Sequence, residues 1–209
     1  MTLTTLILFL GASMALTIAP GPDNIFIITQ GLARGRRSAI VTAWGMCSGI
    51  TVHTLAAAAG ISALFYSSAL AFQVVKYAGA AYLLYLSWQV LRERGPLAVR
   101  SGGTVAGPGG AALFRRGFIM NVLNPKVALF FLAFLPQFTV REAGSIPVQM
   151  VVLGLVFMAQ ALVIFTIIGF FSGSVGGWLQ RRPKAGLYFN RLAGGIIALL
   201  GLRLALVER

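Results

Sequence analysis

Two residues of opposite charge each follow a proline inside an apolar stretch of the chain. Asp23 follows Pro22, and Lys126 follows Pro125. A carboxylate binds an ammonium group and an ammonium binds a carboxylate, so the pair can hold both ends of a zwitterion. A charge at the centre of a membrane helix costs about 2.5 to 3.5 kcal/mol, so both side chains are expected to face the protein interior. The spacing predicts a zwitterion site in which the two charges pair when it is empty; mutual neutralisation alone is the simpler alternative.

The prolines also predict where two helices break. Pro20, Gly21 and Pro22 should interrupt the first helix, because proline lacks an N–H group and clashes with the preceding turn. Asn124 before Pro125 is a good N-cap before a good first helical residue, and Pro22 can begin a helix in the same way. Helix N-termini favour anions, so these ends add to the predicted site. A purely structural kink is the alternative.

Polar side chains close to these breaks extend the candidate site. Asn24, Asn121 and Asn124 can orient a ligand through amide hydrogen bonds. Asp23 and His53 are the candidates for a proton relay. Desolvation and a nearby cation shift the pKa of the Asp23 carboxyl in opposite directions, and the sequence leaves open which effect is larger. An interhelical hydrogen bond is the alternative role for His53, and Gln160 is a similar mid-helix polar residue.

The chain has few of the groups that metal binding or catalysis requires. It contains one Cys, one His and four acidic residues. Hard cations require several oxygen ligands, and soft ones require thiolates or imidazoles. We therefore expect no catalytic residues and no metal site, and the single Cys47 excludes an internal disulfide. Two functions other than transport of a zwitterion stay open: the nearer one is export of a metal or other small cation, and the more distant one is catalysis by a membrane-embedded enzyme.

The composition predicts an all-α integral membrane protein. Of 209 residues, 58% are hydrophobic and 10% are charged. A membrane-spanning helix needs roughly 20 apolar residues, and continuous apolar runs argue against a β-barrel. Six such windows are predicted. They run from Leu3 to Leu32, Ala39 to Leu64, Ala69 to Leu91, Gly117 to Pro136, Ile146 to Phe171 and Leu187 to Val207.

The net charge of +13 lies mainly in alternate loops. This distribution follows the positive-inside rule rather than indicating nucleic-acid binding, and it places both termini outside the cytoplasm. The loops expected inside contain Arg34, Arg36, Arg37, Arg92, Arg94, Arg100, Arg115, Arg116, Arg181, Arg182 and Lys184. No basic residue precedes the first apolar run, which argues against a cleaved signal peptide.

A glycine-rich stretch divides the chain into two halves. Residues 97–112 are predicted to be a cytoplasmic linker between a first three-helix repeat, 1–96, and a second, 113–209. Three spans in each half would insert the halves in opposite orientations, with the first and fourth helices broken at proline. Gly45 and Gly49 form a G-x-x-x-G step that fits packing within one chain or between two, so a homo-oligomer stays open.

These residues, taken together and in order, resemble the LysE/RhtB family of amino-acid exporters, also called LysE-type translocators. The resemblance covers nearly the whole chain. It is carried by Ala19-Pro20-Gly21-Pro22-Asp23-Asn24, Lys76 to Leu86, Phe114 to Phe118 with Asn121, Asn124-Pro125-Lys126, Leu135 to Phe138, Asn190 to Gly194, and Gly201-Leu202-Arg203.

The resemblance implies efflux of an amino acid or a derivative across the bacterial cytoplasmic (inner) membrane. Proton coupling is expected, with no organic cofactor, and the expected partners are a small-molecule substrate and membrane lipid, not nucleic acid. Asp23 is the only acidic residue within the predicted spans, so a neutral amino acid is favoured over a dibasic one. The choice between carrier and channel stays open.

Overall fold

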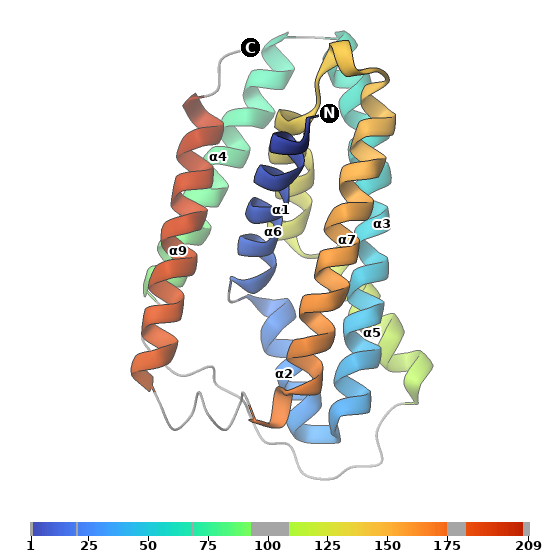
Figure 1. The fold of residues 1–209 in the computed structure, drawn as a ribbon, viewed down its shortest axis with the longest axis vertical. Helices are drawn as coiled ribbons and strands as arrows, with labels where there is room; N and C mark the ends of the chain where they lie inside the picture. The colour runs from blue at the N-terminus through green and yellow to red at the C-terminus, as the bar shows by residue number, and fades with distance from the viewer. Residues whose placement is uncertain (1, 20, 68, 93–108, 175–182, 207–209) are drawn as a thin grey trace.

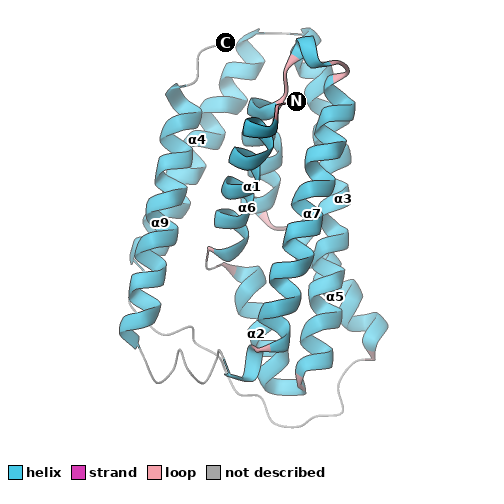
Figure 2. Ribbon diagram, viewed as in Figure 1, coloured by secondary structure: helices cyan, strands magenta, loops and turns pink. Residues whose placement is uncertain are grey.

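The computed structural model describes residues 2–19, 21–67, 69–92, 109–174 and 183–206. Within these ranges the chain is helical, without strands (Figures 1 and 2). The elements are α1 (Leu3–Ile18), α2 (Pro22–Arg34), α3 (Arg36–Ser67), α4 (Ala69–Arg92), α5 (Gly110–Val122), α6 (Pro125–Leu129), the π-helix η1 (Phe130–Phe134), the 3-10 helices η2 (Leu135–Phe138) and η3 (Arg141–Ala143), α7 (Ile146–Phe170) and α9 (Pro183–Leu206).

Every predicted apolar window corresponds to one helix or to a bent pair of helices. The first window is α1 with α2, which meet at 54°, and the fourth is α5 followed by residues 125–138, which meet at 48°. Among the described residues, α3 and α7 are each long and apolar enough to cross a membrane, and the number becomes four if each bent pair is one span. Helices α4 and α9 match the third and sixth windows in position. Among the described residues, neither helix meets the length and hydropathy required of a membrane span, although the part of α9 from Gly194 to Leu206 is a shorter apolar helix.

The predicted linker, residues 97–112, ends earlier in the structure than the sequence suggested. Helix α5 begins at Gly110, so the last residues of the 97–112 stretch are helical. Residues 97–108 lie outside the described residues. Gly109 is the N-cap of α5 and Gly110 its first residue, so neither glycine lies in the helix interior, where glycine is disfavoured.

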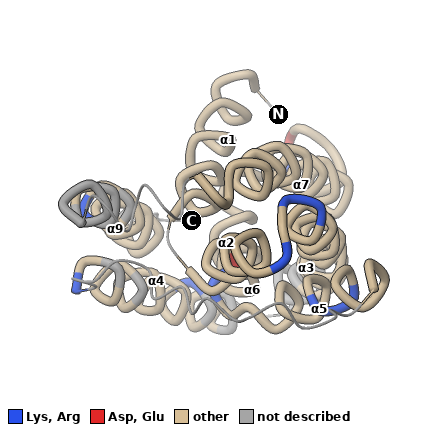
Figure 3. Tube along the Cα trace, turned by 90° about the horizontal axis from the view of Figure 1, so that it is seen from below, with Lys and Arg blue, Asp and Glu red and all other residues tan. Residues whose placement is uncertain are grey.

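The helices form two outer groups with the broken helices between them (Figures 1 and 3). Helix α4 packs along α9, and α3 packs along both α5 and α7. Helix α1 and the segment formed by α6 and η1 connect these groups, since α1 contacts α7 and α9 while α6 and η1 each contact α3 and α4. Helix α2 packs on α3 and α7. The broken segments therefore lie in the interior of the bundle.

Glycines permit the close approach of α3 and α5. A Cβ atom added to Gly45 would overlap the Phe114 carbonyl group, and one added to Gly117 would overlap the carbonyl oxygen of Thr42. The G-x-x-x-G step therefore packs within this chain, where small residues let two helix backbones meet.

Aromatic rings hold the second broken helix against its neighbours. The Phe9 ring lies 5.2 Å from that of Phe138 on η2, and the Phe131 ring lies 5.1 Å from that of Phe157 on α7. Phe130 and Phe134, also in this cluster, are fully buried with ring centroids 4.9 Å apart. This packing fixes the segment that follows Pro125.

Candidate functional site

The first break leaves backbone carbonyl groups of α1 without their helical donors. In a continuous helix, Leu16 O would accept from residue 20 and Ile18 O from residue 22. Both positions are proline, which has no N–H group. The sequence thus creates unpaired acceptors at the end of α1, and these must be satisfied in the interior.

Two side chains supply the missing donors. Lys126 Nζ donates to Leu16 O at 2.9 Å and to Ala19 O at 3.1 Å. Asn24 Nδ2 lies 3.0 to 3.1 Å from the carbonyl oxygens of Thr17, Ile18 and Ala19. The C-terminal end of a helix carries partial negative charge, so a lysine ammonium is well suited to this position.

The second break repeats this pattern. Helix α5 ends at Val122, and Pro125 begins α6 with Asn124 as its N-cap: the Asn124 side chain accepts from Lys126 N at 2.9 Å, as predicted. Pro125 cannot donate to Asn121 O, which instead accepts from Asn124 N and lies 2.9 Å from His53 Nε2. The Nε2–H tautomer of His53 is the one that donates to this carbonyl.

The remaining predicted residues lie around the first break. Pro22 is the first residue of α2 with Gly21 as N-cap. A Cβ atom on Gly21 would lie 3.2 Å from Lys126 Nζ, so this position allows the lysine to approach closely. Pro20 lies outside the described residues, whereas Pro125 is described and exposed.

Asp23 and Lys126 are both buried, with exposed fractions of 3% and 5%. Asp23 Oδ2 accepts from Asn121 Nδ2 at 3.3 Å, and Asp23 Oδ1 has no hydrogen-bond partner. The prediction that the two charges pair directly is wrong for this conformation, because the Lys126 ammonium is held by the carbonyl groups of α1. The two charged groups are close enough to interact electrostatically, although they form no hydrogen bond with each other.

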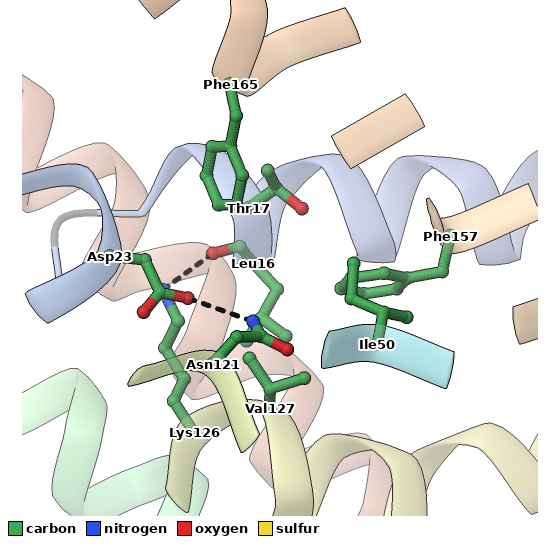
Figure 4. Close-up of a pocket in the computed structure, with 9 residues that line it drawn as sticks. All are labelled: Leu16, Thr17, Asp23, Ile50, Asn121, Lys126, Val127, Phe157 and Phe165. Atoms are coloured by element: carbon green, nitrogen blue, oxygen red, sulfur yellow. Dashed lines mark hydrogen bonds between the residues drawn. The ribbon is translucent and has the colours of Figure 1, made fainter. Parts of the chain in front are cut away.

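A small cavity separates these groups from an apolar wall (Figure 4). It is lined by Leu16, Thr17, Asp23, Ile50, Asn121, Lys126, Val127, Phe157 and Phe165. Its volume of about 10 Å³ is close to that needed for one water molecule. A molecule of the size of an amino acid does not fit a cavity of this volume.

Sequence reasoning found the polar half of the cavity and missed the other half. Asp23, Asn121 and Lys126 line it as one group, whereas Asn24, Asn124 and His53 support the broken ends around it. The missed residues are Thr17 and the apolar ones. Thr17 lies three positions before the first proline, and this spacing was the one available signal.

Comparison with known proteins places these residues in a family. The family model described as "LysE type translocator" matches residues 14–208. A homoserine/homoserine lactone efflux protein of Salmonella typhimurium is 29% identical, with 94% of each chain covered. An uncharacterized membrane protein of Vibrio cholerae is 32% identical over 94% of each chain, and a leucine efflux protein of Enterobacter sp. is 27% identical over 88% of this chain and 85% of the relative. No solved structure matches.

Proposed function

Because the chain belongs to the LysE type translocator family and is a transporter rather than an enzyme, we propose that it exports a neutral amino acid through the site between its two broken helices. The ammonium group of the substrate binds Asp23, and its carboxylate binds Lys126 and the N-terminus of α6. The observation that carries the proposal is the buried Asp23 carboxylate with one oxygen unpaired, close to a buried ammonium in a cavity.

The contacts of Lys126 support a role in binding. Its ammonium has three donor hydrogens, and two carbonyl oxygens accept from it. One donor is therefore left for a substrate carboxylate. Charge-assisted hydrogen bonds of this kind are stronger than neutral ones, so a carboxylate can compete with the carbonyl groups for the ammonium.

The surroundings of the site support a neutral side chain. Leu16, Ile50, Val127, Phe157 and Phe165 form the apolar part of the cavity lining, and none of them can pair with a second cation. Homoserine and leucine, which appear in the names of two relatives, are both neutral. We therefore favour a substrate of this class over a dibasic one.

The arrangement of the halves supports an inverted repeat of six spans. Helices α1 and α2 run toward one end of the bundle, and α5 followed by α6 runs back toward the other (Figure 1). Both pairs bend at a proline, and α3 pairs with α7 as α4 pairs with α9. These are the relations that a two-fold axis in the membrane plane would generate.

Charge supports an orientation in the bacterial inner membrane. The end of α2, the start of α3, the end of α4 and the start of α5 lie toward one end of the bundle (Figure 1), and these segments contain Arg34, Arg36, Arg92 and Arg115. Figure 3, viewed from that end, shows basic residues on these helices. The start of α1 and the end of α9 lie at the opposite end (Figure 1). By the positive-inside rule the basic end faces the cytoplasm and the termini face outward.

We assign proton coupling to Asp23, with His53 as the second candidate. Asp23 has an oxygen that can take up a proton inside the cavity, and it is the group that the substrate ammonium would contact. His53 lies against the Asn121 carbonyl, and the Asn121 side chain donates to Asp23. Alternate binding of proton and ammonium by one carboxylate would couple their opposite movements.

Transport by everted vesicles tests this function. Vesicles with an imposed pH gradient receive a panel of labelled amino acids, and we expect at least one neutral amino acid to accumulate. Asp23→Asn and Lys126→Ala should lower the rate at least about tenfold, while Arg115→Gln, which removes an exposed charge on α5, should not. Accumulation of none would contradict amino-acid export.

Normal transport by well-inserted Asp23→Asn and Lys126→Ala proteins would contradict the assigned site. Counterflow in proteoliposomes distinguishes the carrier from a passive channel, because a channel does not exchange labelled for unlabelled substrate against a gradient.

A further inference from the structure

Gln160 is a buried polar residue that the site described above does not use. It lies in the middle of α7 with an exposed fraction of 9%. Its Nε2 donates to Thr17 Oγ1 at 2.9 Å, whereas its Oε1 has no hydrogen-bond partner. A buried acceptor without a donor is unfavourable, so this oxygen requires an explanation.

The orientation of the Gln160 amide is fixed by its neighbour. Thr17 Oγ1 donates its own hydrogen to Ser13 O at 2.9 Å, so toward Gln160 it can only accept. The amide nitrogen must therefore face Thr17, and the amide oxygen must face away from it. Rotating the amide would bring two acceptors together.

The position of Gln160 places its amide close to the cavity, although the residue itself is not part of the lining. Thr17, its hydrogen-bond partner, lines the cavity. So do Phe157, one helical turn earlier on α7, and Phe165, later on the same helix. Gln160 is thus a buried polar group that bonds to one lining residue, Thr17, and lies on the helix that supplies Phe157 and Phe165.

We propose that Gln160, oriented by Thr17, determines the preference of the site for hydroxylated over aliphatic amino-acid side chains. When the helices separate to admit a substrate, a side-chain hydroxyl donates to Gln160 Oε1, while the ammonium and carboxylate occupy Asp23 and Lys126. An aliphatic side chain of the same size leaves the oxygen unpaired. The inference rests on the proposed amino-acid export and adds the group that selects the side chain.

Pairs of substrates with nearly equal shape isolate the effect of the hydroxyl group. Threonine is compared with valine, and homoserine with norvaline, in proteoliposomes of the purified protein. The measured quantity is the ratio of kcat/KM within each pair. We expect the unaltered protein to favour the hydroxylated member, and Gln160→Met, which keeps the length of the side chain, to reduce the ratio about tenfold.

Gln149→Met is the matched control. Gln149 is a second buried glutamine on α7, and its amide bonds to Val140 and Gly144 rather than to the cavity. This variant is expected to keep the ratio, whatever its effect on yield.

The outcomes separate the inference from the function on which it rests. An unaltered protein that transports both members of each pair equally would overturn the role of Gln160, even if no variant folded. So would an unchanged ratio in Gln160→Met. Transport of no amino acid at all would instead contradict the proposed function.

Discussion

Replacing Gly45 by alanine should separate α3 from α5 and destabilise the protein. The added Cβ atom would overlap the carbonyl carbon and oxygen of Phe114, which belong to the backbone of α5 and cannot rotate away. Overpacking typically costs 1 to 3 kcal/mol, and alanine recovers up to about 1 kcal/mol of helix propensity. Since the clash is with backbone atoms, the cost should lie in the upper half of that range, about 2 to 3 kcal/mol, so the net loss is about 1 to 2 kcal/mol.

Gly60→Ala is the control, because it makes the same change on the same helix. A Cβ atom at Gly60 meets nothing within 4 Å, so only the gain in helix propensity applies. Thermal unfolding in detergent measures both variants. For a chain of this size we expect the Tm of Gly45→Ala to fall by roughly 2 to 8 °C and that of Gly60→Ala to stay equal or rise.

A double substitution tests whether the two helices separate as units. Gly117→Ala brings a Cβ atom against the Thr42 carbonyl group in the same interface. Once one alanine has pushed the helices apart, the second should cost less, so the combined loss should be smaller than the sum of the single losses. A Gly45→Ala protein as stable as the Gly60→Ala protein would refute the close contact of α3 with α5.

Three further substitutions test the support of the site. Gly49→Ala places a Cβ atom 2.9 Å from Asn121 Oδ1, so it should displace the amide that holds Asp23 and raise the KM for substrate; an unchanged KM would contradict this. Asn24→Leu removes the donor shared by the α1 carbonyl groups and should lower the Tm in detergent by several degrees, and no change would show that water replaces it. His53→Gln keeps an N–H donor for the Asn121 carbonyl but cannot carry a proton, so unchanged transport across external pH values would assign His53 a structural role and leave Asp23 as the relay.

The sequence predicted the features that depend on local chemistry. Proline removes a donor wherever it occurs, so both breaks were placed correctly, and the Asn124 N-cap followed from the asparagine-proline pair. Burial of Asp23 and Lys126 followed from the cost of charge in an apolar span. These inferences needed no knowledge of neighbouring helices.

The features that the sequence did not predict depend on how helices rotate and pair. Phe157 and Phe165 line the cavity, but in an apolar span nothing in the sequence distinguishes a residue that faces a cavity from one that faces lipid. The partner of Lys126 could not be predicted either, because its long side chain reaches carbonyl groups that only the fold brings near. The opposite charge was the obvious partner, and the broken end of α1 was the actual one.

The donors that close the two breaks have a consequence for biosynthesis. Lys126 from the second half satisfies carbonyl groups at the end of α1, and His53 from the first half satisfies the Asn121 carbonyl at the end of α5. While the ribosome is still making the second half, the first half has acceptors in the membrane that lack this lysine donor. Under the proposed arrangement of two repeats, each repeat therefore needs a donor from the other. Residues 1–96 and 113–209 should then be stable when produced together and short-lived when produced alone.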